Sequence, residues 1–247
     1  MVSKLRFPKI NYEYWSTKNN YFSDIPLLVT IKQGLEHASK AGLIKPLLEK
    51  IKTNADLVKL IQLKIKEYKK INDFSDLEIL VIFDLIQGWG GRMGRMPYCR
   101  PKAQPVRMTL KELPNIYRLG VKYCVTGDYE SALDMLMSIK TMGESFATKH
   151  IFFWSSEFGE NPSALPIYDT RIKRLLFPGN LKSASYDVYV KLLNERAVEL
   201  AMPSHMVERA LFSFSQNYFS NNKLILKSDI VDNTDIKEAE FLQNIPY

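Results

Sequence analysis

The feature that most constrains the fold is the apolar run FSDLEILVIFDLIQGWGG at residues 74–91. Ser75 and Glu78 stand three residues apart at its beginning, which is the spacing of a capping box at a helix start. Within 77–86 only Glu78 and Asp84 are charged. A helix that is apolar on nearly every side must be covered on nearly every side, so we predict a central buried helix. A buried β-strand is the competing interpretation, but the capping box and the lack of other strand-like runs argue against it.

Helical signals continue along the rest of the chain. Five apolar residues between Leu43 and Ile51 fall on one helical stripe. Asn54 is a candidate cap for the amphipathic run 55–70, and Thr109 for a helix that ends near residue 125. Further helices are predicted at 129–140 after Gly127 and Asp128, at 146–158, at 170–177 after Asp169, and near 186–201 and 204–219.

The segments between these helices carry loop signals. Residues 88–106 are rich in Gly, Pro and Arg and are predicted to form a long ordered loop. Residues 224–226 are a candidate short extended piece. We therefore predict an all-α fold of two helical lobes with a cleft between them. The approximate lobes are residues 1–108 with part of the C-terminal helices, and residues 109–185.

Charge and composition narrow the class of protein. The net charge is +7, which suits a polyanionic partner without proving one. Cys99 and Cys124 form no CxxC pair, and the three histidines His37, His150 and His205 lie too far apart in sequence to complete a zinc set. The N-terminal segment MVSKLRFPKINYEYW has no apolar core, and no stretch approaches the roughly 18 apolar residues of a membrane helix. We expect a cytoplasmic monomer with no membrane partner and no metal.

One stretch, residues 135–176, combines residues that carry chemistry. It predicts two helices joined by a tight turn, with Lys149 in the first turn of the second helix. Asp169 follows 20 residues later at the start of another helix. Alone, Thr148 and Lys149 would be a solvated pair and Asp169 a helix cap. Their occurrence together, in a basic all-α chain, favours catalysis, whereas His150 beside the lysine receives no role.

This pattern resembles the helix-hairpin-helix DNA glycosylases, and within them the 8-oxoguanine DNA glycosylase group. In that group a Gly-x-Gly-Thr-Lys type motif supplies a nucleophilic lysine, and an aspartate further along the chain completes the site. Thr148 and Lys149 match the end of the motif, and Asp169 matches the aspartate. The segment GWGGRMGR is also similar to a Trp-Gly segment of a bacterial branch of such proteins. The resemblance implies a DNA glycosylase, with an associated AP lyase activity, that flips an 8-oxoguanine-like base out of double-stranded DNA, and a nucleoid association in a bacterium.

The chemistry of base excision suits these residue types. Breaking an N-glycosidic bond builds positive charge on the sugar, and a nearby carboxylate stabilises that charge. An amine attacks C1′ only when it is unprotonated, so a lysine with the ordinary pKa of about 10.4 must be desolvated or placed near other cations. Phe146 and Phe153 lie at i−3 and i+4 from Lys149, on the same helix face, and could supply a dry surface.

The resemblance also implies how DNA is held. In the family the hairpin amides hold a DNA phosphate, often with a monovalent cation. Here Ser145 and Ala147 stand where the motif has glycines, so that cation is in question and no cofactor is predicted. The candidate hairpin contacts are Gly143, Ser145, Phe146, Ala147 and Thr148, the candidate loop contacts are Arg92, Arg95 and Arg100, and the candidate base-pocket residues are Trp89 and Phe153.

Three alternatives remain open at the level of sequence. The excised base could be another modified base, including one in phage DNA. The chain could instead be a helix-hairpin-helix module that binds DNA without catalysis. It could also be a structural or interaction protein whose basic charge is incidental, which a steep salt dependence of duplex binding would exclude.

Overall fold

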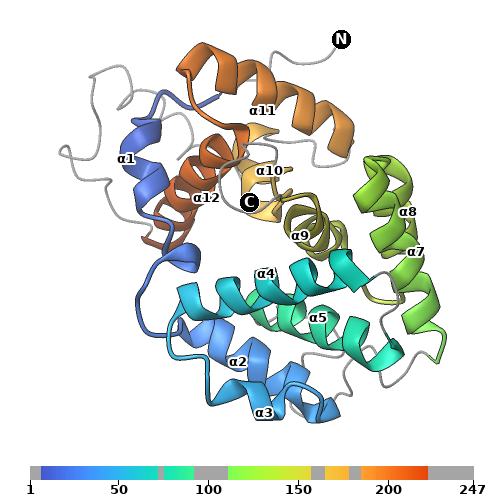
Figure 1. Cartoon of the computed structure of the whole chain (residues 1–247). Coiled ribbons are helices and arrows are strands. Elements are labelled where there is room, and N and C mark those ends of the chain that lie inside the picture. Colours follow the sequence, from blue (N-terminus) through green and yellow to red (C-terminus); the bar gives the residue numbers. More distant parts are fainter. Residues whose placement is uncertain (1–6, 72–74, 92–110, 157–164, 178–184, 222–247) are drawn as a thin grey trace. The chain divides into compact units, whose positions relative to one another are not determined.

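A computed structural model of the chain describes residues 7–71, 75–91, 111–156, 165–177 and 185–221. All the regular elements of these residues are helices, and their extended pairing is limited to one isolated bridge between Pro26 and Thr53. The predicted all-α class is therefore confirmed (Figure 1). Residues 92–106 of the predicted loop and residues 224–226 lie outside the described part of the chain. No described helix combines the length and apolar character needed to span a membrane.

The chain divides into two compact units. Unit 1 comprises Met1–Asn19 with Tyr168–Tyr247, and unit 2 comprises Asn20–Ile167. These bounds differ from those of the predicted lobes, because the helices that follow residue 108 pack onto helices that precede it. That connection is made within unit 2 by contacts of α5 (Asp76–Trp89) with α7 (Leu113–Thr126) and α9 (Glu144–Ser155), and of α4 (Asn54–Ile71) with α9.

Unit 2 is built around α5. Its helices are α2 (Val29–Ala38), α3 (Lys45–Leu48), α4 (Asn54–Ile71), α5 (Asp76–Trp89), α7 (Leu113–Thr126), α8 (Tyr129–Met137) and α9 (Glu144–Ser155), with short 3₁₀ turns η1 (Asn20–Phe22) and η2 (Ser39–Ala41). Helix α5 packs against α2, α4, α7 and α9, and Figure 1 shows it running beside α4. Its side chains from Ile79 to Ile86 are buried except for Val81, which is half-buried. The prediction of a central buried helix is thus confirmed within this unit.

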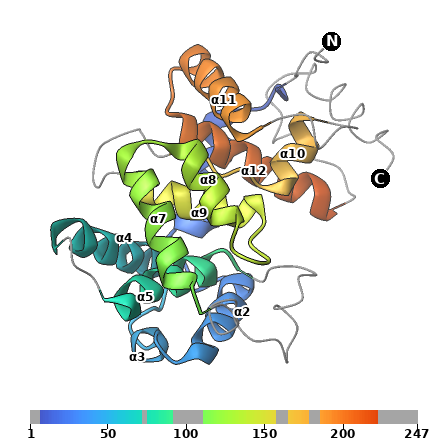
Figure 2. The same ribbon diagram turned by 90° about the vertical axis from the view of Figure 1, so that its right-hand side faces the viewer.

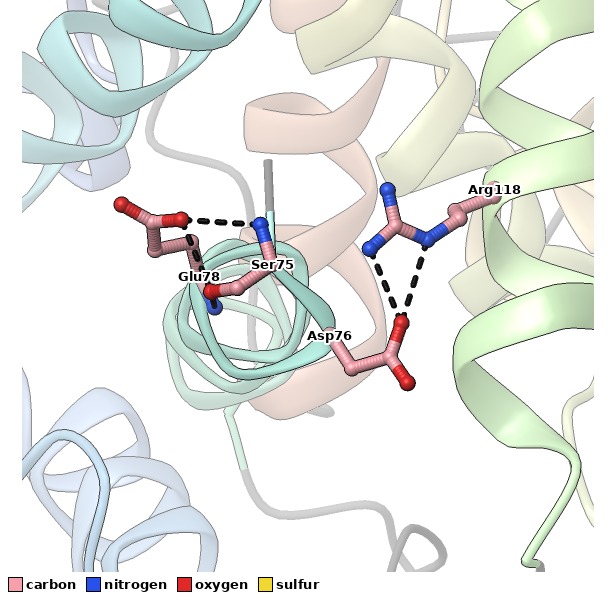
Figure 3. Close-up of polar contacts among 4 residues, drawn as sticks. All are labelled: Ser75, Asp76, Glu78 and Arg118. Carbon is pink, nitrogen blue, oxygen red and sulfur yellow. Dashed lines mark hydrogen bonds and ion pairs between the residues drawn. The ribbon is translucent and has the colours of Figure 1, made fainter. Parts of the chain in front are cut away.

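The capping box that begins α5 is also confirmed. The Ser75 hydroxyl accepts a hydrogen bond from the Glu78 amide at 3.3 Å, and the Glu78 carboxylate accepts from the Ser75 amide at 2.9 Å (Figure 3). Next to it, Arg118 of α7 donates to the Asp76 carboxylate at 2.9 Å. This ion pair is exposed, so it orients the two helix surfaces more than it stabilises them.

The predicted helix starts near Leu43 and Asn54 need correction. Of the stripe from Leu43 to Ile51, only Lys45–Leu48 is helical, because Pro46 fits only a first turn and i→i+3 hydrogen bonds end the helix at once. Asn54 does not cap α4. The Thr53 hydroxyl accepts from the Asp56 amide at 3.1 Å instead, and Asn54 uses its side chain to bind backbone groups of Leu28 and Asn20.

The cap at the α7–α8 junction agrees with the sequence. Gly127 ends α7 with φ 81°, and the Asp128 carboxylate accepts from the Ser131 amide at 3.1 Å to begin α8. Helix α7 itself begins at Leu113, later than the predicted start after Thr109, and Thr109 lies outside the described residues. Pro114 occupies its first turn, where a missing amide hydrogen costs nothing.

Helices α2 and α5 approach each other closely at Gly34. A Cβ placed on Gly34 would lie 2.3 Å from the Gly88 carbonyl oxygen and 2.9 Å from Gly91 Cα. Because both obstacles are backbone atoms, they cannot move aside without shifting a helix. Glycine at position 34 is therefore required by the close approach of the two helices.

Gly34→Ala is expected to lower the free energy of unfolding by about 1–3 kcal/mol, which urea denaturation would measure. The matched control is Gly120→Ala in α7, where the new Cβ would meet a side-chain atom of Leu136 at 3.1 Å. Both substitutions gain about 1 kcal/mol of helix propensity. The difference between their free energies of unfolding therefore reports the contact of position 34 with the backbone of Gly88 and Gly91. Equal stability of the two variants would contradict the close crossing.

Unit 1 is assembled on α12. Its helices are α1 (Tyr12–Thr17), α10 (Thr170–Leu176), α11 (Tyr186–Leu200) and α12 (Ser204–Asn221), and α12 packs against each of the other three (Figures 1 and 2). Trp15 of α1 meets Phe214 of α12 edge to face, with ring centroids 5.5 Å apart. The predicted helices at 170–177, 186–201 and 204–219 are confirmed, with small differences at their ends.

Candidate active site

The hairpin that leads into α9 is closed by backbone atoms. Gly143 is the N-cap, and its carbonyl oxygen accepts from the amides of Phe146 and Ala147 at 2.9 and 3.0 Å. Helix α9 consequently begins at Glu144, two residues before the predicted start. Lys149 therefore lies in the second turn of the helix and not, as predicted, in the first.

The Lys149 side chain folds back along its own helix. Its Nζ donates to the Ser145 carbonyl oxygen at 3.1 Å and lies 3.0 Å from the Ser145 hydroxyl. It also lies 4.7 Å from the centroid of the Phe146 ring. Both neighbours are one turn toward the helix N-terminus, the direction in which helical side chains slant. The residue is only 7% exposed, so the amine sits in a cradle of one polar and one aromatic side chain.

Phe146, one of the two phenylalanines predicted beside the lysine, thus makes the expected contact. Phe153, the other, is fully buried in an aromatic cluster with Trp89, at 5.0 Å between ring centroids. Trp89 donates from Nε1 to the Tyr21 carbonyl oxygen at 3.3 Å and also meets Phe152. All these partners belong to unit 2. Trp89 and Phe153 are core residues here, so stacking of either on an extruded base stays a prediction that would require this core to open.

The other predicted DNA contacts on the hairpin are inside α9. Ala147 and Thr148 are buried, and the Thr148 hydroxyl lies 3.3 Å from the Ser145 carbonyl oxygen. A DNA phosphate would have to compete with Gly143 for the amides of Phe146 and Ala147. The loop candidates Arg92, Arg95 and Arg100 lie outside the described residues.

A polar network that sequence reasoning missed surrounds His150. The buried imidazole contacts Tyr117 Oη of α7 through Nδ1 at 2.8 Å and the Gln87 amide nitrogen of α5 through Nε2 at 3.0 Å. Trp154, one turn further along α9, donates to the same Tyr117 oxygen at 2.9 Å. The only sequence signal is that His150 and Trp154 share a helix face at i and i+4. The network joins α5, α7 and α9 at the residue that follows Lys149 in the sequence.

Burial lowers the pKa of His150 to about 3, and the neighbouring charge of Lys149 acts in the same direction. The imidazole is therefore neutral near pH 7. Because the Gln87 amide nitrogen faces Nε2, that atom accepts a hydrogen bond, and Nδ1 carries the proton toward Tyr117. A neutral histidine serves here as a connector between helices.

His150→Gln is expected to flatten the dependence of stability on pH. At pH values between the ordinary pKa of 6.5 and the folded pKa of about 3, His150 is protonated in the unfolded chain and neutral in the folded chain. The contribution of the neutral His150 to the free energy of unfolding is present above this pH window. It is lost as pH falls through the window, by up to about 1.4 kcal/mol per pH unit. Urea unfolding of both proteins across the window would measure it. A stability difference that stays constant with pH would contradict the buried neutral imidazole.

Asp169 begins α10, as predicted, but it belongs to unit 1, whereas the predicted lobe 109–185 grouped it with Lys149. Its Oδ1 accepts from the Arg171 amide at 3.0 Å, and the residue is half-buried. The preceding Tyr168 is fully buried and stacks on Tyr189 with centroids 4.2 Å apart. Burial raises the pKa of Tyr189 well above its ordinary value, and the charges of Glu208 and Asp169 add to this effect. The carboxylate is thus held at a capped helix start beside a rigid, neutral aromatic cluster.

The two predicted catalytic residues belong to different units. Lys149 belongs to unit 2 and Asp169 to unit 1. Their joint action therefore rests on the sequence pattern and stays a prediction.

In the described part of the chain, neither a metal cluster nor a reactive thiol offers a competing site. No three His, Cys, Asp or Glu side chains gather there as a possible metal site. Burial raises the pKa of the Cys124 thiol to about 12, so the thiol stays protonated at neutral pH and is a poor nucleophile.

Comparison with known proteins identifies one family. Residues 68–212 match the family described as "Putative 8-oxoguanine DNA glycosylase OGG-like protein". The matched range contains α5, α9 and α10, and with them both Lys149 and Asp169. No curated protein and no solved structure matches the chain.

Proposed function

The chain belongs to the 8-oxoguanine DNA glycosylase OGG-like family, and we propose that it removes an 8-oxoguanine-like base from double-stranded DNA with Lys149 as nucleophile. The observation that carries this proposal is the cradle of Lys149. A lysine that is 7% exposed, with its amine against Ser145 and over the Phe146 ring, is not the solvated surface lysine that is usual for this residue type.

The proposed reaction begins when the unprotonated Lys149 amine attacks C1′ of the damaged nucleotide. The new bond joins Nζ to C1′, the bond from C1′ to the base breaks, and its electron pair leaves with the base, which takes up one proton while the attacking nitrogen loses one. The Asp169 carboxylate stabilises the positive charge that develops on the sugar. Ring opening then gives a Schiff base between Nζ and C1′, and β-elimination from it breaks the strand on the 3′ side.

Binding of DNA and exposure of the base complete the proposal. The net charge of +7 favours a polyanion, and the hairpin with Arg92, Arg95 and Arg100 supplies the proposed phosphate contacts. Because C1′ is shielded while the base is stacked, the target nucleotide has to be flipped out of the duplex. No metal or other cofactor takes part in these steps.

The test is incubation with a panel of duplexes followed by borohydride. The panel contains 8-oxoguanine, several other modified bases including those found in phage DNA, an abasic site, and undamaged DNA. We expect base release and a covalent adduct with the 8-oxoguanine duplex, and an adduct with the abasic duplex. Release of a different base would change the substrate but keep the mechanism. Salt-dependent binding to every duplex without release or trapping would leave a non-catalytic DNA-binding module.

A further inference from the structure

The Trp-Gly segment at the end of α5 meets the cradle of Lys149 through one residue, Gly90. Gly90 ends α5 with φ −60° and ψ −13°, an ordinary helical conformation that any residue adopts. Its backbone therefore does not require glycine. The space around it does, because a Cβ at this position would lie 2.4 Å from Cε1 and 2.9 Å from Cζ of the Phe146 ring.

The same ring lies beneath the lysine amine, with its centroid 4.7 Å from Nζ. Gly90, Phe146 and Lys149 thus form a stack that runs from the end of α5 to the proposed nucleophile, entirely within unit 2. The obstacle to a larger residue is a side-chain ring that can turn, not backbone. Filling the space would therefore displace the ring more than it would disturb the fold.

We propose that Gly90 is a positioning residue for Lys149. Because Gly90 has no side chain, the Phe146 ring can occupy the space next to it, and the ring in turn fixes the position of the Lys149 amine. This inference rests on the proposed function, and it gives the Trp-Gly segment a role in placing the Lys149 amine. The atoms nearest to a Cβ at position 90 all belong to Phe146, so the proposed effect of Gly90 on Lys149 passes through that ring.

The first test needs no activity. Lysine labelled with ¹³C at Cε reports the ring current of Phe146 on the Lys149 methylene, and Lys149→Gln identifies that signal. Gly90→Ala should shift the signal toward the position that it takes in Phe146→Leu. Gly120→Ala, which crowds a leucine elsewhere in unit 2, should leave it unchanged. An unshifted signal in Gly90→Ala would overturn the proposal.

The second test is the rate of borohydride trapping on an abasic duplex in a single turnover. Gly90→Ala should slow it by about ten- to hundredfold, because a displacement of about 1 Å of a reacting group costs that much, while the midpoint of unfolding and DNA affinity change little. In a Phe146→Leu background the same substitution should change the rate less than about twofold, since coupled residues are not additive. A full effect in that background would show that Gly90 acts by another route.

The two failures are distinguishable. If the natural chain is trapped by no duplex, the proposed function fails, while the lysine signal still decides whether Gly90 places the amine through Phe146. If the natural chain is trapped and Gly90→Ala is trapped equally fast, only the positioning role fails.

Discussion

Lys149→Gln is expected to abolish borohydride trapping and to slow base release by at least about a thousandfold, because the amide has no lone pair that can attack C1′. Glutamine keeps polar bulk in the cradle, where its amide can donate to the Ser145 carbonyl oxygen as the amine does. DNA affinity and the midpoint of thermal unfolding should therefore stay close to those of the natural chain. Single-turnover assays on the 8-oxoguanine duplex measure trapping and base release. Binding titrations measure DNA affinity, and a thermal melt measures the midpoint of unfolding.

Lys18→Gln is the matched control. Lys18 Nζ lies 4.6 Å from the centroid of the Tyr14 ring, so this variant also removes a lysine amine from an aromatic face. It should be trapped and should release the base at the natural rate. If Lys149→Gln released the base as fast as Lys18→Gln but gave no adduct, water and not Lys149 would be the nucleophile.

Three of the predicted helix starts are marked by capping side chains. The α5 start follows from the reciprocal bonds of Ser75 and Glu78, and the starts of α8 and α10 follow from Asp128 and Asp169. Helix α2 has no such signal. Its N-cap Leu28 makes no side-chain bond, and Gly34 lies in its middle, so the close packing on α5 stabilises a segment of low helix propensity.

The sequence proposes the residues of the candidate site but does not give their local geometry. The hairpin pattern points to Lys149 but not to the first residue of α9. That start is set by the Gly143 carbonyl oxygen, and no capping side chain marks it in the sequence. The partners of His150 come from positions 33 and 63 residues away, so only the tertiary fold reveals them. The sequence pattern marks Ser145 only as a departure from glycine, whereas in the structure its hydroxyl lies 3.0 Å from the lysine amine.

Asp169→Asn is expected to slow base release by at least about a hundredfold while leaving stability within about 0.5 kcal/mol. Asparagine caps a helix about as well as aspartate, so the hydrogen bond from the Arg171 amide should survive. The negative charge that would stabilise the developing oxocarbenium ion is lost. The substitution thus separates the two roles of one residue, and single-turnover base release with urea unfolding measures them independently.

Asp128→Asn supplies the comparison that makes this result decisive. Asp128 caps α8 by accepting from the Ser131 amide at 3.1 Å, so the same substitution removes the charge of a capping aspartate without a proposed part in the reaction. Equal stabilities with a slow Asp169→Asn and a fast Asp128→Asn would assign the loss to the missing charge. If both variants released the base at the rate of the natural chain, Asp169 would be a helix cap without a part in the reaction. Trapping at the abasic site should persist in Asp169→Asn more than base release does, because that substrate has already lost the bond whose cleavage requires the carboxylate.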